Sequence, residues 1–477
     1  MTSIKKSGKL QLSEHAVFLC NKKTNLSSTG LTEKEIAFAK TQLDKNEKQS
    51  VVINQFNRVV IVQTAESKKQ KYLTAENWRK AGANLVAVCN EFKISQIAVI
   101  DLLNDSETTL AFAEGLALGN YQFLRYKNKP EKEINSLKTI LVSSKKVKDK
   151  DLEYLQIIEE AVSKTRTLVN EPVSFLNAVQ LSKEFEKMGK EAGFKVEVLH
   201  KAKIEALKMG GLLAVNKGSI DPPTFTIMEW KPQRAKNKKP IVLVGKGVVY
   251  DTGGLSLKPT ANSMDLMKCD MAGSAAVAGI MYAIAKAKIP VHVIALAPAT
   301  DNRPGENAYA PGDIITMMSG LTVEMLNSDA EGRMILADAL HYAKRYEPEL
   351  VMEFSTLTGA AMAAIGSFGI VAMGTAGDAI KNKLKQSGNN VYERLAEFPF
   401  WEEYDDLIKS DIAEIKNIGG PYGGSITAGK FLARFTDYPF MHFDIAGPAF
   451  LTAKDTWRGK GGTGVGVRLL VDYLKRK

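Results

Sequence analysis

Three short segments of the chain combine charged side chains with glycines, other small residues and apolar runs. They are residues 245–258 (GKGVVYDTGGLSLK), 265–270 (DLMKCD) and 327–333 (NSDAEGR). The acidic residues that stand out in them, called the acidic quartet below, are Asp251, Asp270, Asp329 and Glu331. Carboxylates in apolar surroundings need partners, because a desolvated anion is costly and neighbouring anions repel each other.

Divalent cations are the partners that four converging carboxylates favour. Two such ions balance the charge of the quartet, and carboxylate oxygens are common ligands of hard dications. A pair of bound ions can also polarise a carbonyl and generate a hydroxide nucleophile near neutral pH. The acidic quartet therefore predicts metal-assisted hydrolysis.

Helix capping is the main alternative for the last segment. Ser328 and Glu331 have the spacing of a capping box, in which both side chains satisfy the first amides of a helix. Taken alone, this segment supports a cap and a metal site about equally. The glycines of the first segment favour the metal site, since they let the backbone approach a ligand closely. Lys246 and Lys258 lie among apolar residues there, where an ammonium must be paired or deprotonated.

Hydrophobic periodicity predicts the elements that position these segments. Strand-like runs occupy residues 241–244, 291–297, 322–326 and 350–355, and helical spacing occupies residues 271–286 and 334–345. Such alternation predicts an α/β fold with a mostly parallel, helix-covered mixed sheet. Ligands of these sheets bind at the carboxyl ends of the strands, and Asp329 and Glu331 follow one of them closely.

The first third of the chain has its own alternation of elements. Strands are predicted at residues 15–20, 50–64 and 96–103, and helices at residues 32–47, 77–92 and 107–117. Residues 127–150 are rich in lysine and predict a surface connection or a linker helix. We expect two domains: a smaller N-terminal α/β domain with its linker at residues 1–150, and a larger catalytic domain at residues 151–477.

Composition and cysteine usage exclude several classes of protein. The chain has 477 residues, of which 45% are hydrophobic and 25% charged, so disorder is not expected. Cys20, Cys89 and Cys269 lack CxxC spacing, which argues against a disulfide framework and a zinc–thiolate site. Because no apolar run has the length of a signal peptide or a membrane span, we expect a soluble cytoplasmic protein with no membrane partner.

The formal net charge of +11 permits a polyanionic partner. Much of the excess is lysine scattered through the first third and short linkers, which favours solvated faces. No helix-turn-helix or interleaving of aromatic and basic residues indicates nucleic-acid binding, which stays an open but unexpected alternative. The five histidines share no ligand spacing, and His292 and His442 are expected to be hydrogen-bonded core residues.

The three segments together resemble those of the leucyl aminopeptidase family, also called cytosol aminopeptidases. The family signature is Asn-Thr-Asp-Ala-Glu-Gly-Arg, and Ser328 replaces its threonine here. The resemblance runs from Arg166 to the C-terminus and includes residues 444–447 (DIAG), whereas the first third matches only in general form. The chain differs from the family at Cys269, where a small residue is commoner, and at Lys430, where an apolar residue is commoner.

This resemblance implies a site for two metal ions, zinc in general, with manganese, magnesium or cobalt able to replace one of them. Asp251 and Glu331 would bridge both ions, and Asp329 would complete the exchangeable site. Lys246, as a neutral amine, and Asp270 would complete the tighter site. A metal-bridging water would then attack the scissile carbonyl.

The resemblance also implies roles for the residues around the metals. Lys258 would stabilise the oxyanion, and Arg333 would hold a bicarbonate that acts as general base. The residues that would bind the substrate are Met267, Asn327, Thr356, Leu357, Gly359, Ala446 and Ala449. Leu357 would offer its backbone amide to the intermediate.

The activity implied is the removal of N-terminal residues from peptides, with leucine and other apolar residues preferred. The family further implies a homohexamer whose active sites face an inner cavity. A DNA-binding architectural role, which some bacterial members also perform, is the rival that the basic composition permits. A scaffold without metal is disfavoured, because every expected ligand is present.

Overall fold

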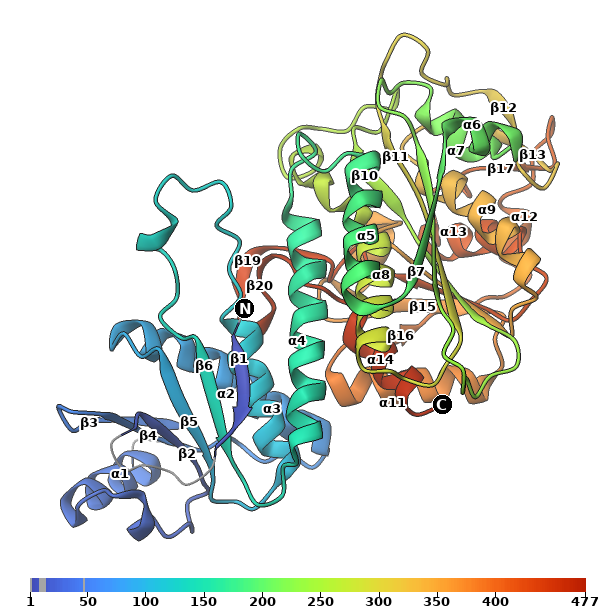
Figure 1. The fold of residues 1–477 in the computed structure, drawn as a ribbon. Coiled ribbons are helices and arrows are strands. Elements are labelled where there is room, and N and C mark those ends of the chain that lie inside the picture. The colour runs from blue at the N-terminus through green and yellow to red at the C-terminus, as the bar shows by residue number, and fades with distance from the viewer. Residues whose placement is uncertain (1, 8–13, 46–47) are drawn as a thin grey trace. The chain divides into compact units, whose positions relative to one another are not determined.

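The computed structural model describes residues 2–7, 14–45 and 48–477, which form two compact units (Figure 1). Unit 1 comprises Met1–Ser163 with Ala453–Gly459, and unit 2 comprises Lys164–Thr452 with Lys460–Lys477. Both units are α/β, as predicted. The predicted domain boundary at residue 150 stays a prediction, since the compact units divide within a long helix, α4 (Asp149–Asn170).

Unit 1 contains a six-stranded sheet in the order β1-β6-β5-β2-β4-β3, in which only β3 is antiparallel to its neighbour. Its strands are β1 (Ser3–Lys6), β2 (Ala16–Leu19), β3 (Ser50–Asn54), β4 (Val59–Gln63), β5 (Gln96–Asp101) and β6 (Thr139–Ser143). Its helical elements are η1 (Ser27–Thr29), α1 (Glu33–Lys45), α2 (Lys71–Glu91), α3 (Ser106–Gly119), η2 (Pro130–Lys132) and η5 (Thr456–Arg458).

Successive side chains of these strands point to opposite faces of the sheet, and each face packs in its own hydrophobic core. Val17 and Val99 pack with Trp78 and Phe112 of α2 and α3 on one face of the sheet. Phe18 and its neighbours pack with α1 on the other face. Residues 50–64, predicted to be extended from their β-branched and apolar runs, form the antiparallel pair β3 and β4.

Two other predictions in unit 1 need comment. The predicted helix at residues 32–47 corresponds to α1, and residues 46–47 lie outside the described residues. The connection predicted at residues 127–150 was wrong in part, because it contains β6, which pairs between β1 and β5. The lysines on both sides of this five-residue strand dominate the local composition and conceal its alternation of buried and half-buried residues.

A buried ionic cluster, called the unit 1 ion cluster below, links α2 and α3. Arg79 Nη1 lies 2.5 Å from Glu76 Oε2, and Arg79 Nε lies 2.7 Å from Glu114 Oε2. The indole Nε1 of Trp457 donates to Glu76 Oε1 at 2.9 Å. The side chains of Arg79 and Glu76 are only 4% and 3% exposed.

Unit 2 is built on a nine-stranded mixed sheet in the order β16-β15-β18-β14-β9-β11-β8-β7, with β10 paired to β11. Its strands are β7 (Lys195–His200), β8 (Thr224–Trp230), β9 (Ile241–Gly245), β10 (Gly247–Asp251), β11 (Val293–Asn302), β14 (Leu350–Ser355), β15 (Ile370–Gly374), β16 (Leu395–Glu397) and β18 (Phe440–Asp444). The central strands β11, β9, β14 and β18 run parallel, as predicted.

Helices cover both faces of this sheet, and smaller strands border it. The helices are α5 (Ala178–Ala192), α6 (Lys201–Ala206), α7 (Gly210–Asn216), α8 (Ala272–Lys286), α9 (Gly332–Ala343), α10 (Gly359–Ile365), α11 (Asp378–Val391), α12 (Glu403–Asp406), α13 (Gly424–Ala433) and α14 (Val467–Lys475). The 3-10 helices are η3 (Met264–Met271) and η4 (Lys344–Tyr346). The remaining strands are β12 (Asp313–Thr316), β13 (Thr322–Met325), β17 (Ile415–Lys416), β19 (Phe450–Asp455) and β20 (Gly459–Gly462).

The packing of α8 shows how its sequence fits the sheet. Residues 272–285 of this helix are all buried, which its run of small and apolar residues allows. A Cβ at Gly273 would lie 2.0 Å from the carbonyl oxygen of Phe354 in β14, so only glycine permits this approach. On the opposite face, Leu212, Ile335 and Phe431 of α7, α9 and α13 form one core with the strands.

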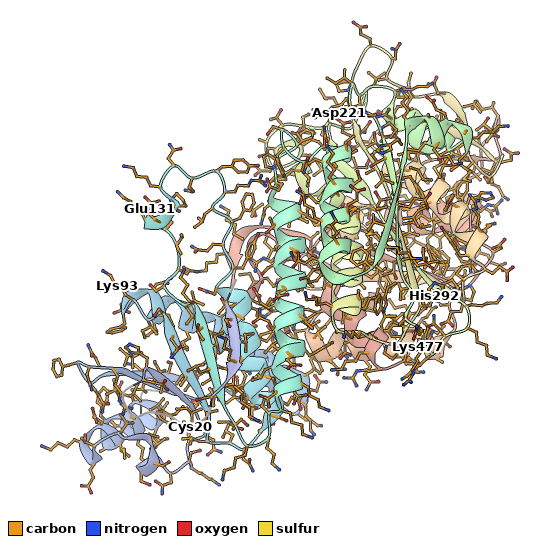
Figure 2. The ribbon with its side chains drawn as sticks, in the orientation of Figure 1. Cys20, Lys93, Glu131, Asp221, His292 and Lys477 are labelled. Atoms are coloured by element: carbon orange, nitrogen blue, oxygen red, sulfur yellow. The ribbon has the colours of Figure 1, made fainter. Side chains whose placement is uncertain are left out.

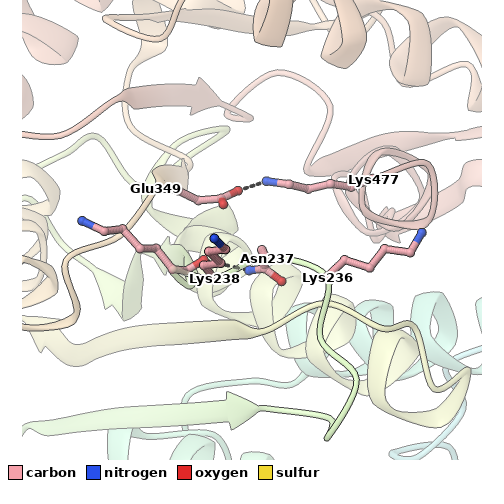
Figure 3. A pocket seen from close by; sticks show the side chains of 6 residues that line it. Lys236, Asn237, Lys238, Glu349 and Lys477 are labelled. Atoms are coloured by element: carbon pink, nitrogen blue, oxygen red, sulfur yellow. Dashed lines mark hydrogen bonds and ion pairs between the residues drawn. The ribbon is translucent and has the colours of Figure 1, made fainter.

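The amino edge of the parallel strands carries a surface pocket of about 480 Å³ (Figure 3). Asn237 ties the loop there, since it accepts the N–H of His292 at 2.8 Å and donates to the carbonyls of His292 and Lys239. Lys477 pairs with Glu349 beside it. His292, labelled in Figure 2, also lies 2.9 Å from Glu229 through Nε2, which confirms it as a hydrogen-bonded residue.

No helix in the described parts of the chain combines the length and apolar character needed to cross a membrane.

Candidate active site

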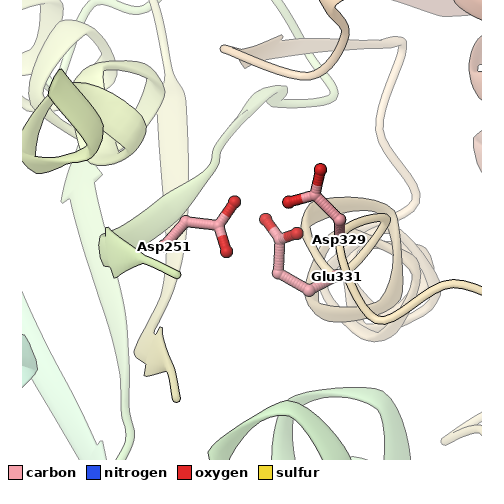
Figure 4. A group of neighbouring side chains, drawn as sticks. All are labelled: Asp251, Asp329 and Glu331. Carbon is pink, nitrogen blue, oxygen red and sulfur yellow. The ribbon is translucent and has the colours of Figure 1, made fainter. Parts of the chain in front are cut away.

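The acidic quartet gathers at the carboxyl edge of the sheet in unit 2. Asp251 ends β10, Asp270 lies on η3, and Asp329 and Glu331 lie between β13 and α9. Asp251, Asp329 and Glu331 point toward one another (Figure 4), and each offers an oxygen atom within 4.8 Å of the others. Lys246, which directly follows β9, reaches the same place.

Lys246 forms the deep half of the site with Asp270 and Glu331. Its Nζ lies 2.8 Å from Asp270 Oδ2 and 2.9 Å from Glu331 Oε1, and these three side chains are at most 5% exposed. Burial alone would lower the pKa of Lys246, but the charges of Asp270, Glu331 and Asp251 outweigh it and raise that pKa. A neutral Lys246 therefore needs a cation close by to repel the proton.

Lys258 forms the outer half with Asp251 and Asp329. Its Nζ lies 2.9 Å from Asp251 Oδ2 and contacts Asp329 Oδ1. Exposure rises toward this side, from 3% for Asp251 to 15% for Lys258 and 34% for Asp329. Burial alone would lower the pKa of Lys258, but the charges of Asp251 and Glu331 raise it overall.

The carboxylates outnumber the cations that face them. Burial, with the charge of Asp251 added, raises the pKa of Asp270 to about 6 and that of Glu331 well above its usual value. Asp270 Oδ2 and Glu331 Oε1 face Lys246 at ion-pair distance. Among the described residues, Glu331 Oε2 has no hydrogen-bond partner. These oxygen donors with surplus negative charge fit divalent cations.

The capping-box alternative for Ser328 and Glu331 is not supported by the geometry. Glu331 precedes α9 with a helical backbone and makes no side-chain cap hydrogen bond. Ser328 Oγ instead donates to the carbonyl of Gly253 at 2.6 Å and accepts the N–H of Ser256 at 2.7 Å. This hydroxyl therefore joins two of the three segments singled out in the sequence.

Gly332 lets the deep lysine reach its partners. A Cβ at this position would lie 2.5 Å from Lys246 Cε and 2.6 Å from Lys246 Nζ. Such contacts are shorter than real Cβ atoms make, so a side chain at residue 332 would displace Lys246 from Glu331.

Two asparagines that the sequence reasoning missed support the acidic residues. Asn302, at the end of β11, donates through Nδ2 to Asp251 Oδ1 at 2.8 Å and to the carbonyl of Ser328 at 2.9 Å. The carbonyl of Asn417 accepts Nη1 of Arg333 at 2.5 Å. A polar residue at a strand's carboxyl end is a signal that could have identified Asn302. Asn417 also follows a strand, but this strand, β17, has only two residues and leaves no pattern in the sequence.

Arg333 is buried and has one hydrogen-bond donor without a partner among the described residues. Its side chain lies 5.9 Å from the ring of Phe431, and its Nε has no hydrogen-bond partner among the described residues. Burial lowers the pKa of Arg333 to about 10, and the charges of Glu331 and Asp444 oppose this change. A guanidinium held in this way can bind an anion.

The predicted substrate-binding residues lie on three segments of unit 2. Met267 lies on η3, and Asn327 precedes Asp329, whose N–H it accepts at 2.8 Å. Ala446 and Ala449 follow β18, and Ala449 is buried.

The third segment follows β14. Thr356 Oγ1 donates to Asp270 Oδ1 at 2.7 Å, and Gly359 begins α10. The N–H of Leu357 donates to Asp444 Oδ1 at 3.2 Å, so the amide expected to contact the intermediate has a partner within the chain. Asp444 also accepts Oγ1 of Thr358 at 2.7 Å.

The positions that differ from the expected pattern are accommodated locally. Burial raises the pKa of Cys269 to about 12, so its thiol stays protonated and acts as a small buried side chain. Lys430 Nζ lies 2.8 Å from Asp405 Oδ2 and 4.6 Å from the ring of Phe400. His442 contacts Glu353 in the sheet, which confirms the expected hydrogen-bonded core position.

Comparisons with known proteins decide which family has this site. The catalytic domain of the cytosol aminopeptidase family (Peptidase_M17) matches residues 163–471, and its N-terminal domain matches residues 46–130. The chain belongs to the cytosol aminopeptidase family. It is therefore an aminopeptidase, a hydrolase of the metallo-exopeptidase type.

Named relatives of this family cover most of the chain. The probable cytosol aminopeptidase of Chlorobaculum tepidum is 42% identical over 443 residues, which are 88% of this chain and 86% of the relative. That of Brucella suis is 40% identical over 433 residues, which are 88% of this chain and 84% of the relative. These identities confirm the resemblance noted in the sequence.

Two solved structures share the whole fold. The bottromycin maturation enzyme BotP, in complex with Mn, has a TM-score of 0.85 and 26% identity, with 97% of this chain and 99% of BotP covered. A mutant of tomato leucine aminopeptidase has a TM-score of 0.87 and 25% identity, with 100% of this chain and 97% of that chain covered.

Proposed function

We propose that this aminopeptidase removes leucine and other apolar N-terminal residues from peptides, using two divalent cations. The residues that would hold the cations are Lys246, Asp251, Asp270, Asp329 and Glu331. The observation that carries the proposal is the convergence of Asp251, Asp329 and Glu331 within 4.8 Å, with more carboxylates than paired cations.

The arrangement supports a different role for each ligand. Glu331 contacts Lys246 in the deep half and Asp251 contacts Lys258 in the outer half, and their carboxylates lie within 4.8 Å of each other, which supports these two residues as the ligands that would bind both ions. Asp329 is the most exposed carboxylate and suits the exchangeable ion. The bound ions would supply Lewis-acid polarisation of the scissile carbonyl and an activated water near neutral pH.

The donor set supports the choice of ions that we propose. Carboxylate-rich sites suit manganese and magnesium, and one amine nitrogen adds affinity for zinc or cobalt. The structure of BotP in complex with Mn supports manganese as one candidate. We therefore propose zinc together with manganese, magnesium or cobalt in the exchangeable position.

Lys258 would stabilise the developing oxyanion of the substrate. Its pKa is raised, so the ammonium is charged at neutral pH, and its partial exposure leaves it accessible from outside. Preorganised charge aimed at an oxyanion is among the largest contributions to catalysis.

Arg333 would hold a bicarbonate that takes the proton from the attacking water. Its unmet Nε donor and its burial support an anion there, and a pKa of about 10 keeps it charged at neutral pH. The carbonyl of Asn417 fixes the opposite side of the guanidinium.

The first side-chain pocket would be formed by small and apolar residues. The residues proposed for it are Met267, Thr356, Gly359, Ala446 and Ala449, with Asn327 and Leu357 contacting the substrate backbone. For Leu357 to bind the intermediate, its N–H must exchange Asp444 Oδ1 for the substrate oxygen. Apolar lining of this kind favours leucine-like side chains because it offers no partner to a charged one.

The cellular setting and assembly belong to the same proposal. Relatives carry the name cytosol aminopeptidase, which supports a cytoplasmic enzyme of peptide turnover. We propose a homohexamer and a functional division into residues 1–150 and 151–477. Sedimentation analysis and limited proteolysis would test these two points.

Removal of the metals tests the central proposal. Chelation and dialysis should abolish hydrolysis of a leucine amide, and Mn²⁺ or Zn²⁺ should restore it. The proposal fails if the dialysed protein, shown to be free of metal by elemental analysis, keeps full activity.

Replacement of Lys258 by Met tests the oxyanion role. The turnover number should fall by about 100–1,000-fold, as for removal of one oxyanion donor, while the metal content stays unchanged. Lys430→Met is the matched control, because Lys430 is a buried lysine with a carboxylate partner outside the acidic quartet. Equal turnover in the Lys258 variant and this control would contradict the role.

A further inference from the structure

Asn417 directly follows β17 and connects this strand to the loop that carries Asp329 and Glu331. We propose that Asn417 is a positioning residue that sets the geometry of Asp329 and Glu331 for metal binding and of Arg333 for its anion. This inference rests on the proposed two-metal function. Asn417 is fully buried and lies directly after β17.

The side-chain amide of Asn417 holds the loop by its backbone. Its Oδ1 accepts the N–H of Leu326 at 2.8 Å and that of Asn327 at 3.3 Å. Its Nδ2 donates to the carbonyls of Asn327 at 2.8 Å and Ala330 at 3.5 Å. One planar group therefore fixes both ends of the turn that contains Asp329.

The backbone of Asn417 completes the connection. Its N–H donates to the carbonyl of Glu324 at 2.9 Å, which continues the parallel pairing of β13 with β17. Its carbonyl accepts Nη1 of Arg333 at 2.5 Å. A single residue thus contacts the chain before, within and after the segment that carries Asp329 and Glu331.

Asparagine suits this position because the loop presents both N–H and carbonyl groups to it. Aspartate has the same shape but no side-chain donor, so it would place a carboxylate oxygen against the carbonyls of Asn327 and Ala330. The loop needs an external support because Asp329 and Glu331 both face Asp251, and like charges repel. The support comes from Asn417 on one side and from Asn302, through the carbonyl of Ser328, on the other.

A positioning role differs in its effects from a purely structural one. Asn417 is not among the residues that offer a metal-binding atom, and its side chain bonds only to backbone groups of the loop. Residues that orient metal ligands typically change metal affinity by about 10–100-fold when replaced. A purely structural residue would lower the melting temperature without changing the affinity of the folded protein for metal.

The matched control is Asn237, labelled in Figure 3, at the opposite edge of the same sheet. It ties a loop through three amide hydrogen bonds, two with the backbone of His292 and one with that of Lys239. Asn417→Ala, Asn417→Asp and Asn237→Ala would be titrated with Mn²⁺ by calorimetry after chelation, and their melting temperatures measured. We expect the weakest Mn²⁺-binding step to have a dissociation constant about 10–100-fold higher in both Asn417 variants. The turnover number should fall more than KM changes, and Asn237→Ala should bind Mn²⁺ as the wild type does.

The outcomes separate this inference from the proposed function. If the wild-type protein binds no Mn²⁺ or Zn²⁺, the two-metal function fails and the inference fails with it. If the wild type binds Mn²⁺ and folded Asn417→Asp binds it equally well, only the positioning role is overturned. Because the aspartate variant keeps the size of the side chain, it decides the question even if Asn417→Ala does not fold.

Discussion

The unit 1 ion cluster and the acidic quartet are both buried and both charged, but they are organised differently. In unit 1, Glu76 receives Arg79 on one oxygen and the indole of Trp457 on the other. Burial would lower the pKa of Arg79, but the charges of Glu114 and Glu76 outweigh it and raise that pKa. Glu76 and Glu114 thus stabilise the charged form of Arg79.

The acidic quartet leaves its negative charge incompletely paired. Four carboxylates face Lys246 and Lys258, and Glu331 Oε2 has no hydrogen-bond partner among the described residues. Burial raises the pKa of Asp270 and Glu331, which shows that their ionised forms are costly as they stand. Both clusters hold two carboxylates for each cation, so the difference lies in hydrogen bonding: both oxygens of Glu76 have partners, whereas Glu331 Oε2 has none among the described residues. Buried carboxylates with satisfied oxygens indicate a structural role, and buried oxygens left without a partner indicate a site for a further ligand.

Replacement of Glu331 by Ala should give the largest effect on activity. We expect kcat/KM for a leucine amide to fall by more than about 1,000-fold, or about 4 kcal/mol. The fold should be retained, because the change removes one of several repelling anions. Steady-state kinetics and circular dichroism check both points. A loss of less than tenfold would place Glu331 with the structural residues and break the comparison.

Replacement of Glu76 by Ala should give the opposite result in unit 1. Because it removes one of the two carboxylates that contact Arg79 and the acceptor of the Trp457 indole, the free energy of unfolding should fall by about 1–3 kcal/mol. The kcat/KM of the folded protein should not change. Urea denaturation followed by circular dichroism measures the loss. If Glu76→Ala lowers activity without lowering stability, the cluster is not merely structural.

Asp338 is a third buried carboxylate, which accepts two backbone N–H groups, and it allows the cost of burying a carboxylate to be measured through the pH dependence of stability. It accepts the N–H of Leu212 at 3.0 Å and that of Met318 at 2.9 Å. Burial raises its pKa to about 7 from 3.8, and these amides oppose the change. Between these values the folded state binds a proton that the unfolded state does not, so this group's stabilising contribution falls as the pH rises.

The corresponding measurement is urea unfolding at pH 5 and pH 8. The contribution of Asp338 should decrease by about 1–3 kcal/mol over this interval, and it should level off above its folded pKa. Asp338→Asn cannot titrate, so the difference in stability between wild type and variant should shrink toward pH 8. A difference that grows with pH would mean that the amides, rather than burial, control this carboxylate.

The sequence was sufficient for the parts of the site that depend on neighbours along the chain. Asp329 and Glu331 lie just beyond a strand and just before a helix, and the rule for parallel sheets places such residues at the ligand-binding edge. The cap and the ligand could not be separated in this way, because both need the same spacing. The tertiary contacts of Ser328 with Gly253 and Ser256 separate them.

Features that depend on distant pairings could not be predicted. β6 is a short strand between lysine-rich stretches, and its place between β1 and β5 follows from pairing rather than composition. Asn417 acts on residues about 90 positions earlier in the chain, and no local pattern announces it. The contact of Leu357 with Asp444 is likewise a contact between neighbouring strand ends, which the resemblance did not indicate.

The close approach of Gly332 to Lys246 has a consequence for how this enzyme can diverge. The end of the Lys246 side chain occupies the volume that a methyl group at residue 332 would need, so residue 332 cannot change freely while Lys246 keeps its place. Alanine at residue 332 requires either that Lys246 move away from Glu331 or that residue 246 be shorter, and the second change removes the amine. We therefore expect residues 246 and 332 to vary together among natural sequences, although they lie far apart in the chain.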